Sequence, residues 1–114
     1  MTLAEKTCQP CRGQTAPLTA RECQPLLAEL DRWQMEDGCR LRKAVSLKDF
    51  KEALALLNRI SDLAEEQGHH PDMLLSWGKL TIDLSTHSVG GLTEADFILA
   101  AKIDALLCLS DIAP

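Results

Sequence analysis

The three histidines of the chain lie close together in the sequence, as His69, His70 and His87. Imidazole has an ordinary pKa of about 6.5, so a group of histidines can take up and release protons near neutral pH. Glu65 lies one helical turn before His69, where a carboxylate can accept a hydrogen bond from the ring and hold one tautomer. These residue types therefore predict general acid–base catalysis on a small polar molecule, with Glu65 orienting His69.

A predicted β-hairpin would bring these side chains together. Two runs typical of strands, 73–77 and 79–86, flank Gly78. Antiparallel pairing about that glycine places residues opposite each other when their numbers sum to about 156, at a spacing of about 5 Å. The two histidines before the first strand then lie near Thr86 and His87. We therefore expect the three imidazoles to meet at the open end of the hairpin, beside the hydroxyls of residues 85 and 86.

Other interpretations of the histidines stay open at this stage. Each could be a solvated loop residue, and three histidines could also bind zinc. Adjacent His69 and His70 tend to point apart in an extended chain, which makes a single metal ion awkward. No serine or cysteine lies in a recognisable setting for a nucleophile, which favours acid–base chemistry over acyl transfer. We therefore predict no metal site.

Periodicity predicts an α+β fold that would position these residues. The segment Thr19–Glu22 has the spacing of a capping box, Asp37-Gly38 is a hairpin turn, and Gly68 followed by Pro71 ends the longest helix. Helices are expected at about 20–31, 46–68 and 93–107, and strands at 33–35, 39–45, 73–77 and 79–86. The order α-β-β-α-β-β-α favours a four-stranded antiparallel sheet with three helices packed on one face. On the longest helix, the expected buried face is Phe50, Ala53, Leu54, Leu57, Ile60, Ser61 and Ala64.

Composition limits the class of protein. The chain has 114 residues, of which 46% are hydrophobic, and a net charge of -5. We expect an N-terminal arm over 1–18, containing the pair Cys8 and Cys11, and a single domain over 19–114. An acidic chain whose longest basic cluster is Arg40–Lys43 is a poor nucleic-acid binder, and no apolar run reaches the roughly 20 residues of a membrane span. Five cysteines and no secretory leader favour a cytoplasmic protein with free thiols.

The residues from 65 onwards also resemble a known family. They carry the pattern Glu65-x3-His69-His70-Pro71-x5-Trp77-x9-His87-x8-Asp96. This pattern, together with Leu84–His87 and Gly91–Thr93, is similar to the signature of the pterin-4a-carbinolamine dehydratases. The resemblance covers roughly residues 18–107 and implies the same α+β fold.

The resemblance implies an activity and roles for individual residues. Members of this family remove water from 4a-hydroxytetrahydrobiopterin to give quinonoid dihydrobiopterin, without a metal or organic cofactor. This recycles the pterin of an aromatic amino acid hydroxylase, typically phenylalanine hydroxylase. By position, the catalytic residues are His69 and His87 as the acid–base pair, His70 as a pterin-binding and proton-handling residue, and Glu65 as the orienting carboxylate. The expected substrate-binding residues are Pro71, Trp77, Ser85, Thr86 and Asp96.

The resemblance also carries alternatives. Gly68 and Met73 depart from the residues common in the family, an acidic and an aromatic residue respectively. Trp77 could be a sheet-packing residue, and Asp96 could serve only as a helix cap. Some relatives are dimerisation cofactors of a homeodomain transcription factor or assembly factors, and Arg40–Lys43 could serve such binding. The exposed edges of the predicted sheet favour a homodimer or homotetramer.

Overall fold

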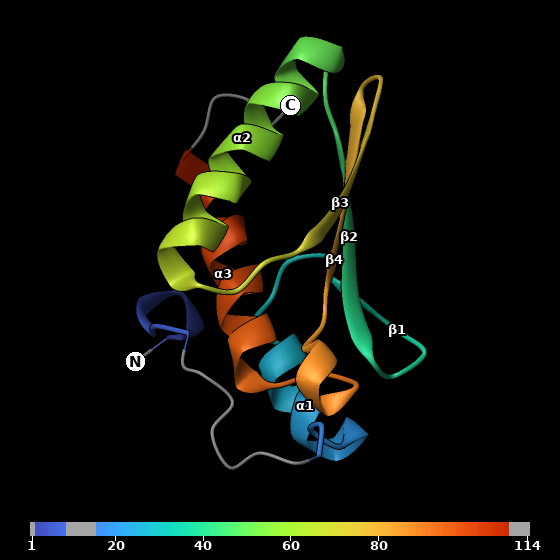
Figure 1. Ribbon diagram of the computed structural model, residues 1–114, viewed down its shortest axis with the longest axis vertical. Coiled ribbons are helices and arrows are strands. Elements are labelled where there is room, and N and C mark those ends of the chain that lie inside the picture. The colour runs from blue at the N-terminus through green and yellow to red at the C-terminus, as the bar shows by residue number, and fades with distance from the viewer. Residues whose placement is uncertain (1, 9–15, 110–114) are drawn as a thin grey trace.

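The computed structural model describes residues 2–8 and 16–109. One antiparallel sheet forms the first layer of the fold, and helices lie along one of its faces (Figure 1). The strands are β1 (Gln34–Glu36), β2 (Arg40–Ser46), β3 (Asp72–Ser76) and β4 (Lys79–Leu84), in the order β1-β2-β4-β3 across the sheet. The helices are α1 (Ala20–Leu27), α2 (Phe50–Gln67) and α3 (Glu94–Leu109), with the short 3-10 turns η1 (Leu3–Glu5) and η2 (His87–Val89). The predicted α+β fold and element order are confirmed.

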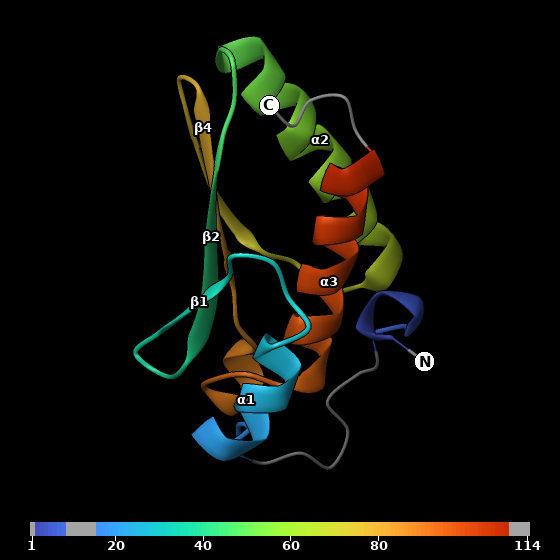
Figure 2. The same ribbon diagram turned by 180° about the vertical axis from the view of Figure 1, so that it is seen from behind.

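The helical layer is built mainly by α2 and α3. Both cover the same face of the sheet, while α1 lies near the beginning of α3, as the view from behind also makes clear (Figure 2). Alternate residues of β2 and β4 point into this layer, and the core they form with α3 is apolar. Among its fully buried side chains are Leu41, Leu80, Ile82, Leu84, Leu56, Ile60, Phe97, Leu99 and Ile103. Within the described residues, no helix is long and apolar enough to cross a membrane.

The hairpin of β3 and β4 is shifted by one residue relative to the expected pairing. Asp72 pairs with Asp83 and Ser76 with Lys79, so paired numbers sum to 155 rather than about 156. The reason is the turn, which contains the two residues Trp77 and Gly78, so its centre lies between them. The ladder stops at Asp72, before the histidines. A one-residue shift exchanges the two faces of a strand, and the expected pairing of the histidines with residues 86 and 87 is not part of the ladder.

The long helix α2 begins later than predicted. Asp49, not Ser46 or Leu47, is its N-cap, because the Asp49 carboxylate accepts a hydrogen bond from the Glu52 backbone N–H at 2.9 Å. The buried face is formed by Ala53, Leu56, Ile60 and Ala64. Phe50 and Leu54 of the predicted face are exposed instead, while Leu57 is partly buried.

Local sequence signals predicted the ends of the other elements to within a few residues. The capping box is present, because the Thr19 backbone N–H donates to Glu22 Oε1 and the Glu22 N–H donates to Thr19 Oγ1. Helix α1 ends at Leu27, four residues before the predicted end, because the chain tightens into i to i−3 hydrogen bonds there. Asp37 and Gly38 both have positive φ, as the predicted hairpin turn requires.

Candidate active site

Asp96 is the centre of a buried polar cluster at one end of the sheet. It lies in the first turn of α3, and its side chain is fully buried. Its Oδ2 accepts hydrogen bonds from the Thr93 backbone N–H at 2.9 Å and from the Thr86 hydroxyl at 2.8 Å. The Thr86 proton is used in that bond, so Thr93 Oγ1 is the donor in its 3.0 Å contact with Thr86 Oγ1. A carboxylate held by several donors is stable without water, so the cluster fixes where Asp96 points.

His69 provides the third partner of Asp96. Gly68 takes the left-handed conformation, with φ 65°, and ends α2. The His69 backbone N–H donates to the Ala64 carbonyl at 3.2 Å, which turns the chain back toward α3. The ring Nε2 then lies 2.6 Å from Asp96 Oδ1. Only 16% of the His69 side chain is exposed.

This contact determines the tautomer of His69. The Asp96 carboxylate only accepts hydrogen bonds, so the Nε2 of His69 carries the proton and donates it. In the neutral ring, Nδ1 is then the atom with a free lone pair. The Asp96 carboxylate thus holds the ring in one orientation, with Nδ1 as its basic atom.

Glu65 orients a different histidine from the one expected. Its Oε2 lies 2.5 Å from His70 Nε2, so the prediction that Glu65 holds His69 is wrong. The reason is that the helix ends at Gly68, and the chain reversal turns His69 inward toward Asp96. Both side chains of the Glu65–His70 pair are well exposed. His69 and His70 thus face different carboxylates, one buried and one at the surface.

His87 is exposed, as His70 is. It begins η2, directly after Thr86, and Thr86 shares the Asp96 carboxylate with His69. Together with Ser85, His87 lines a hollow of about 220 Å³ at this end of the sheet. His69 and His87 are connected through Thr86 and Asp96, while His70 has its own carboxylate.

The remaining predicted substrate-binding residues occupy three kinds of position. Ser85 faces the hollow and Pro71 joins His70 to β3. Thr86 and Asp96 are buried and bonded to each other, and Thr86 also lines the hollow beside His87. Asp96 thus caps α3 and also holds the histidine.

Trp77 does not belong to this site. It lies in the β3–β4 turn, at the other end of the hairpin, and is 74% exposed. With about 3.3 Å per residue, β4 puts roughly 20 Å between that turn and Ser85. Trp77 is therefore too far from this site to contact a substrate there. Its exposure also argues against the alternative that it packs on the sheet.

Sequence reasoning missed Arg40 and Cys39 as members of the site. Both line the hollow beside His87. Arg40 precedes Leu41, which pairs with Leu84, so the β2–β4 register brings Arg40 next to Ser85. The pairing of β2 with β4 would have pointed to these residues, but sequence periodicity alone does not specify which strands pair.

The stretch Arg40–Lys43 does not form a basic patch. The Arg42 guanidinium makes two hydrogen bonds with the Asp83 carboxylate, at 2.7 and 3.0 Å. This pairing raises the pKa of Arg42. Lys43 is buried, and its Nζ lies 2.7 Å from Asp104 Oδ1. Two of the three cations of this stretch, which could serve partner binding, therefore face carboxylates.

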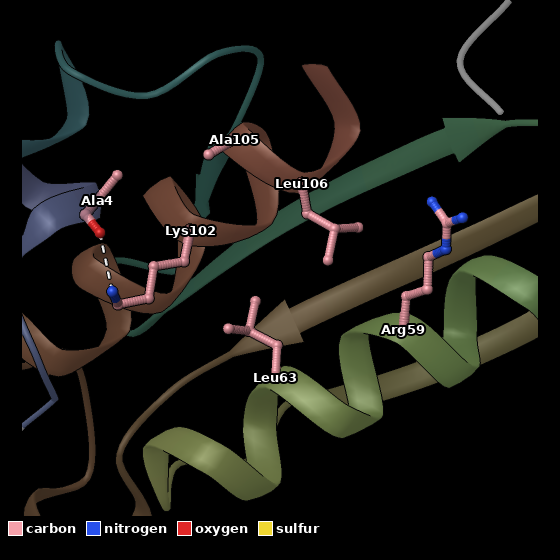
Figure 3. Close-up of a pocket in the computed structure, with 6 residues that line it drawn as sticks. All are labelled: Ala4, Arg59, Leu63, Lys102, Ala105 and Leu106. Carbon is pink, nitrogen blue, oxygen red and sulfur yellow. Dashed lines mark hydrogen bonds between the residues drawn. The ribbon is translucent and has the colours of Figure 1, made fainter. Parts of the chain in front are cut away.

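A larger hollow lies away from the histidines. It has a volume of about 430 Å³ and is bordered by Leu63 of α2 and Leu106 of α3, with Lys102 donating to the Ala4 carbonyl at 2.8 Å (Figure 3). None of the predicted site residues borders it. Over residues 2–8 and 16–109, no three side chains of His, Cys, Asp or Glu are grouped so that they could hold a metal ion.

Of the cysteine pair in the N-terminal arm, one residue lies within the described part of the chain. Cys8 is partly buried, with its Sγ 3.5 Å from the Ala95 carbonyl, while Cys11 lies outside the described residues. Burial raises the pKa of the Cys8 thiol. Cys8, Cys23, Cys39 and Cys108 are free thiols.

Comparison with known proteins identifies the class of this fold and site. The family model described as pterin 4 alpha carbinolamine dehydratase matches residues 16–106. The chain therefore belongs to the pterin 4 alpha carbinolamine dehydratase family.

Two relatives carry the name pterin-4-alpha-carbinolamine dehydratase provisionally. One, from Rubrobacter xylanophilus, is 46% identical over 104 residues, which cover 91% of this chain and 97% of that protein. The other, from Alkaliphilus metalliredigens, is 48% identical over 103 residues, which cover 90% and 93%.

Solved structures share the fold. A transcriptional coactivator/pterin dehydratase from Brucella melitensis has a TM-score of 0.73 and 33% identity, covering 79% of this chain and 97% of that one. A pterin dehydratase-like protein described as a RuBisCO assembly factor in the alpha-carboxysome has a TM-score of 0.56 and 26% identity, covering 67% and 89%. The fold is thus found in proteins described as enzymes and in proteins described by their interactions.

Proposed function

We propose that this chain dehydrates 4a-hydroxytetrahydrobiopterin to quinonoid dihydrobiopterin by histidine acid–base catalysis. The observation that carries the proposal is the His69–Asp96 pair, in which a buried carboxylate accepts a hydrogen bond from Nε2 of the imidazole and so makes Nδ1 its basic atom. His87 lies on the adjoining turn η2, and His70 follows His69 in the chain. Membership of the dehydratase family supports the same activity.

The proposed reaction needs two proton transfers. The C4a–O bond breaks with its electron pair staying on oxygen, and this oxygen takes a proton and leaves as water. A ring nitrogen loses its proton, and the electron pair of that N–H bond forms the new C=N bond. We assign the proton uptake to His69, which Asp96 holds in one tautomer, and the proton delivery to His87. His70, held by Glu65, is assigned to binding the pterin and exchanging protons with solvent.

The proposal involves no metal and no organic cofactor, because imidazoles can supply both proton transfers. It makes an aromatic amino acid hydroxylase the metabolic partner, since such an enzyme releases the hydroxylated pterin. We place the protein in the cytoplasm, where its thiols stay reduced.

A direct assay tests the activity. Freshly generated 4a-hydroxytetrahydrobiopterin is followed by ultraviolet absorbance with and without the protein. We expect the quinonoid product to form faster with protein, in proportion to its concentration. The substrate also dehydrates by itself, so the rate without protein is subtracted. A rate that does not depend on protein concentration would refute the proposed activity.

An interaction role is the second candidate function. It is supported by the two solved neighbours described as a coactivator and as an assembly factor. In the stretch that could serve it, Arg40–Lys43, two of the three cations are paired with carboxylates. The presence of all three histidines together with Glu65 favours catalysis as the first proposal.

We predict that the protein forms a homodimer or homotetramer. Strand β3 is at the edge of the sheet, and the short β1 is at the other edge. Open edges present unpaired backbone groups, which proteins usually cover. Light scattering at micromolar concentration should give a mass two or four times that of the chain. A mass equal to one chain at this concentration would contradict the prediction.

We predict that Cys8→Ser combined with Cys11→Ser leaves dehydration intact. The proposed proton transfers need no thiolate, and the high pKa of Cys8 keeps that thiol protonated at neutral pH. The measurement is the same absorbance assay, with circular dichroism to check folding. A large loss of turnover in a well-folded double variant would show that the arm takes part. Zinc that copurifies with the wild type and is lost in this variant would instead indicate a metal site there.

A further inference from the structure

The hollow beside His87 is lined by a positively charged residue, Arg40, that the proposed reaction does not use. Its walls come from the beginning of β2, the residues after β4 and the loop that follows η2. Its polar side chains are those of Arg40, Ser85, Thr86 and His87. The Thr86 proton is used by Asp96, while the other three groups can donate hydrogen bonds, and none of the side chains in the wall is a carboxylate.

Arg40 is incompletely satisfied in this wall. Its Nε is buried, and it has no hydrogen-bond partner in the described part of the chain. Proteins rarely leave a buried N–H donor unpaired, so the guanidinium of Arg40, a residue that lines the hollow, has hydrogen-bonding capacity left for an acceptor. A guanidinium offers parallel donors that match the two oxygens of a carboxylate or phosphate.

Two carboxylates on the neighbouring strands form ion pairs with Arg42 rather than with Arg40. Glu36 pairs with Arg40 across the β1–β2 ladder, but the ion pair of its Oε1 is with Arg42 Nη1, at 3.9 Å. Asp83, on the neighbouring strand, is held by the same Arg42 through two hydrogen bonds. Both of these acids therefore make their ion pairs with Arg42, and Arg40 makes none with them.

We propose that this hollow binds an anionic group, a carboxylate or a phosphate, carried by the substrate of the neighbouring site. The inference rests on the proposed function, because it takes that substrate to be a pterin. A volume of about 220 Å³ is smaller than a pocket for a whole ligand, and it suits an acidic substituent while the ring lies toward the histidines. The preferred substrates are then hydroxylated tetrahydropterins with an acidic side chain, with Arg40 as the residue that determines this specificity.

The test compares three substrates that differ in the substituent on the ring. The 4a-hydroxy forms are made from tetrahydrobiopterin, whose side chain is neutral, from tetrahydrofolate, which carries carboxylates, and from a tetrahydropterin with a phosphorylated side chain. We expect the wild type to show a KM roughly tenfold lower for an acidic substrate than for the neutral one. The carboxylate and phosphate arms decide which anion is preferred.

Variants of Arg40 connect this preference to the guanidinium. Arg40→Gln should reduce the KM ratio between neutral and acidic substrates to about one, and Arg40→Lys should keep part of it because the charge remains. Lys51→Gln removes one positive charge from the exposed beginning of α2, and it should leave the ratio unchanged. Circular dichroism checks that each variant folds.

The possible outcomes separate the two proposals. Turnover of all substrates with equal KM, or a preference that survives Arg40→Gln, would overturn the anion site while the proposed activity stands. If the wild type turns over none of them, the proposed activity fails. Binding of 6-carboxypterin and of unsubstituted pterin is then compared by titration. Tighter binding of the carboxylated form that is lost in Arg40→Gln would still support the anion site, and equal binding would overturn it.

Discussion

Replacing His69 or His87 by alanine should lower the turnover of 4a-hydroxytetrahydrobiopterin by about 10² to 10⁴-fold, the usual contribution of one positioned acid or base. His69→Ala removes the proton acceptor that Asp96 holds in one tautomer. His87→Ala removes the proposed proton donor to the leaving hydroxyl. The absorbance assay measures both losses after the uncatalysed rate has been subtracted.

Two comparisons make this result specific. Asn58→Ala, at an exposed position of α2, should keep wild-type turnover. Glu65→Ala should cost less than either histidine variant, because Glu65 pairs with the exposed His70 rather than with His69. Wild-type turnover in both histidine variants would refute the acid–base assignment, even if the variants still bind pterin. Thermal unfolding shows whether a loss of turnover reflects a loss of fold.

Local signals were sufficient to predict the elements from the sequence. The capping box at Thr19, the Asp37-Gly38 turn and the Gly68 helix end each depend on residues within a few positions of one another. Such features are encoded by side chains that bond to their own backbone, or by backbone conformations that few residues adopt. The order of elements followed from these signals, and it is observed.

The hydrogen-bond partners of the site residues could not be predicted in the same way. The pairing of Glu65 with His70 rather than with His69 depends on how the chain reverses after Gly68. The second role of Asp96 depends on where α3 packs, since His69 and Asp96 are far apart in the sequence. Helical spacing correctly suggested a cap at Asp96, but it carries no information about a partner from another element.

A buried ion pair shows the same limit in the core. Alternation predicted that Lys43 lies on a strand, and charge placed it in a basic cluster. In the structure its Nζ lies 2.7 Å from Asp104 Oδ1, 2.8 Å from the Asp31 carbonyl oxygen and 5.9 Å from the centre of the Trp33 ring. Asp104 also accepts from Trp33 Nε1 and from the Asp31 N–H, both at 2.9 Å. The cluster ties β2 and the connection after α1 to α3.

Lys43→Met is expected to lower the free energy of unfolding by about 3 kcal/mol. Removing one partner of a buried pair leaves the other charge uncompensated, which typically costs about 3–5 kcal/mol. Asp104 would keep two N–H donors, so the loss should lie at the lower end of that range. Urea unfolding followed by the fluorescence of the tryptophans measures the change, since Trp33 is buried beside this pair.

Lys48→Met is the matched control, because Lys48 is exposed and lies just beyond β2. Substitutions at such surface positions usually change the free energy of unfolding by less than about 0.5 kcal/mol. The two variants make the same chemical change, so the difference between them isolates the burial and pairing of Lys43. Equal unfolding midpoints and slopes for the two variants would mean that the Lys43–Asp104 pair does not stabilise the fold, and that the apolar packing around Trp33 holds β2 against α3 without it.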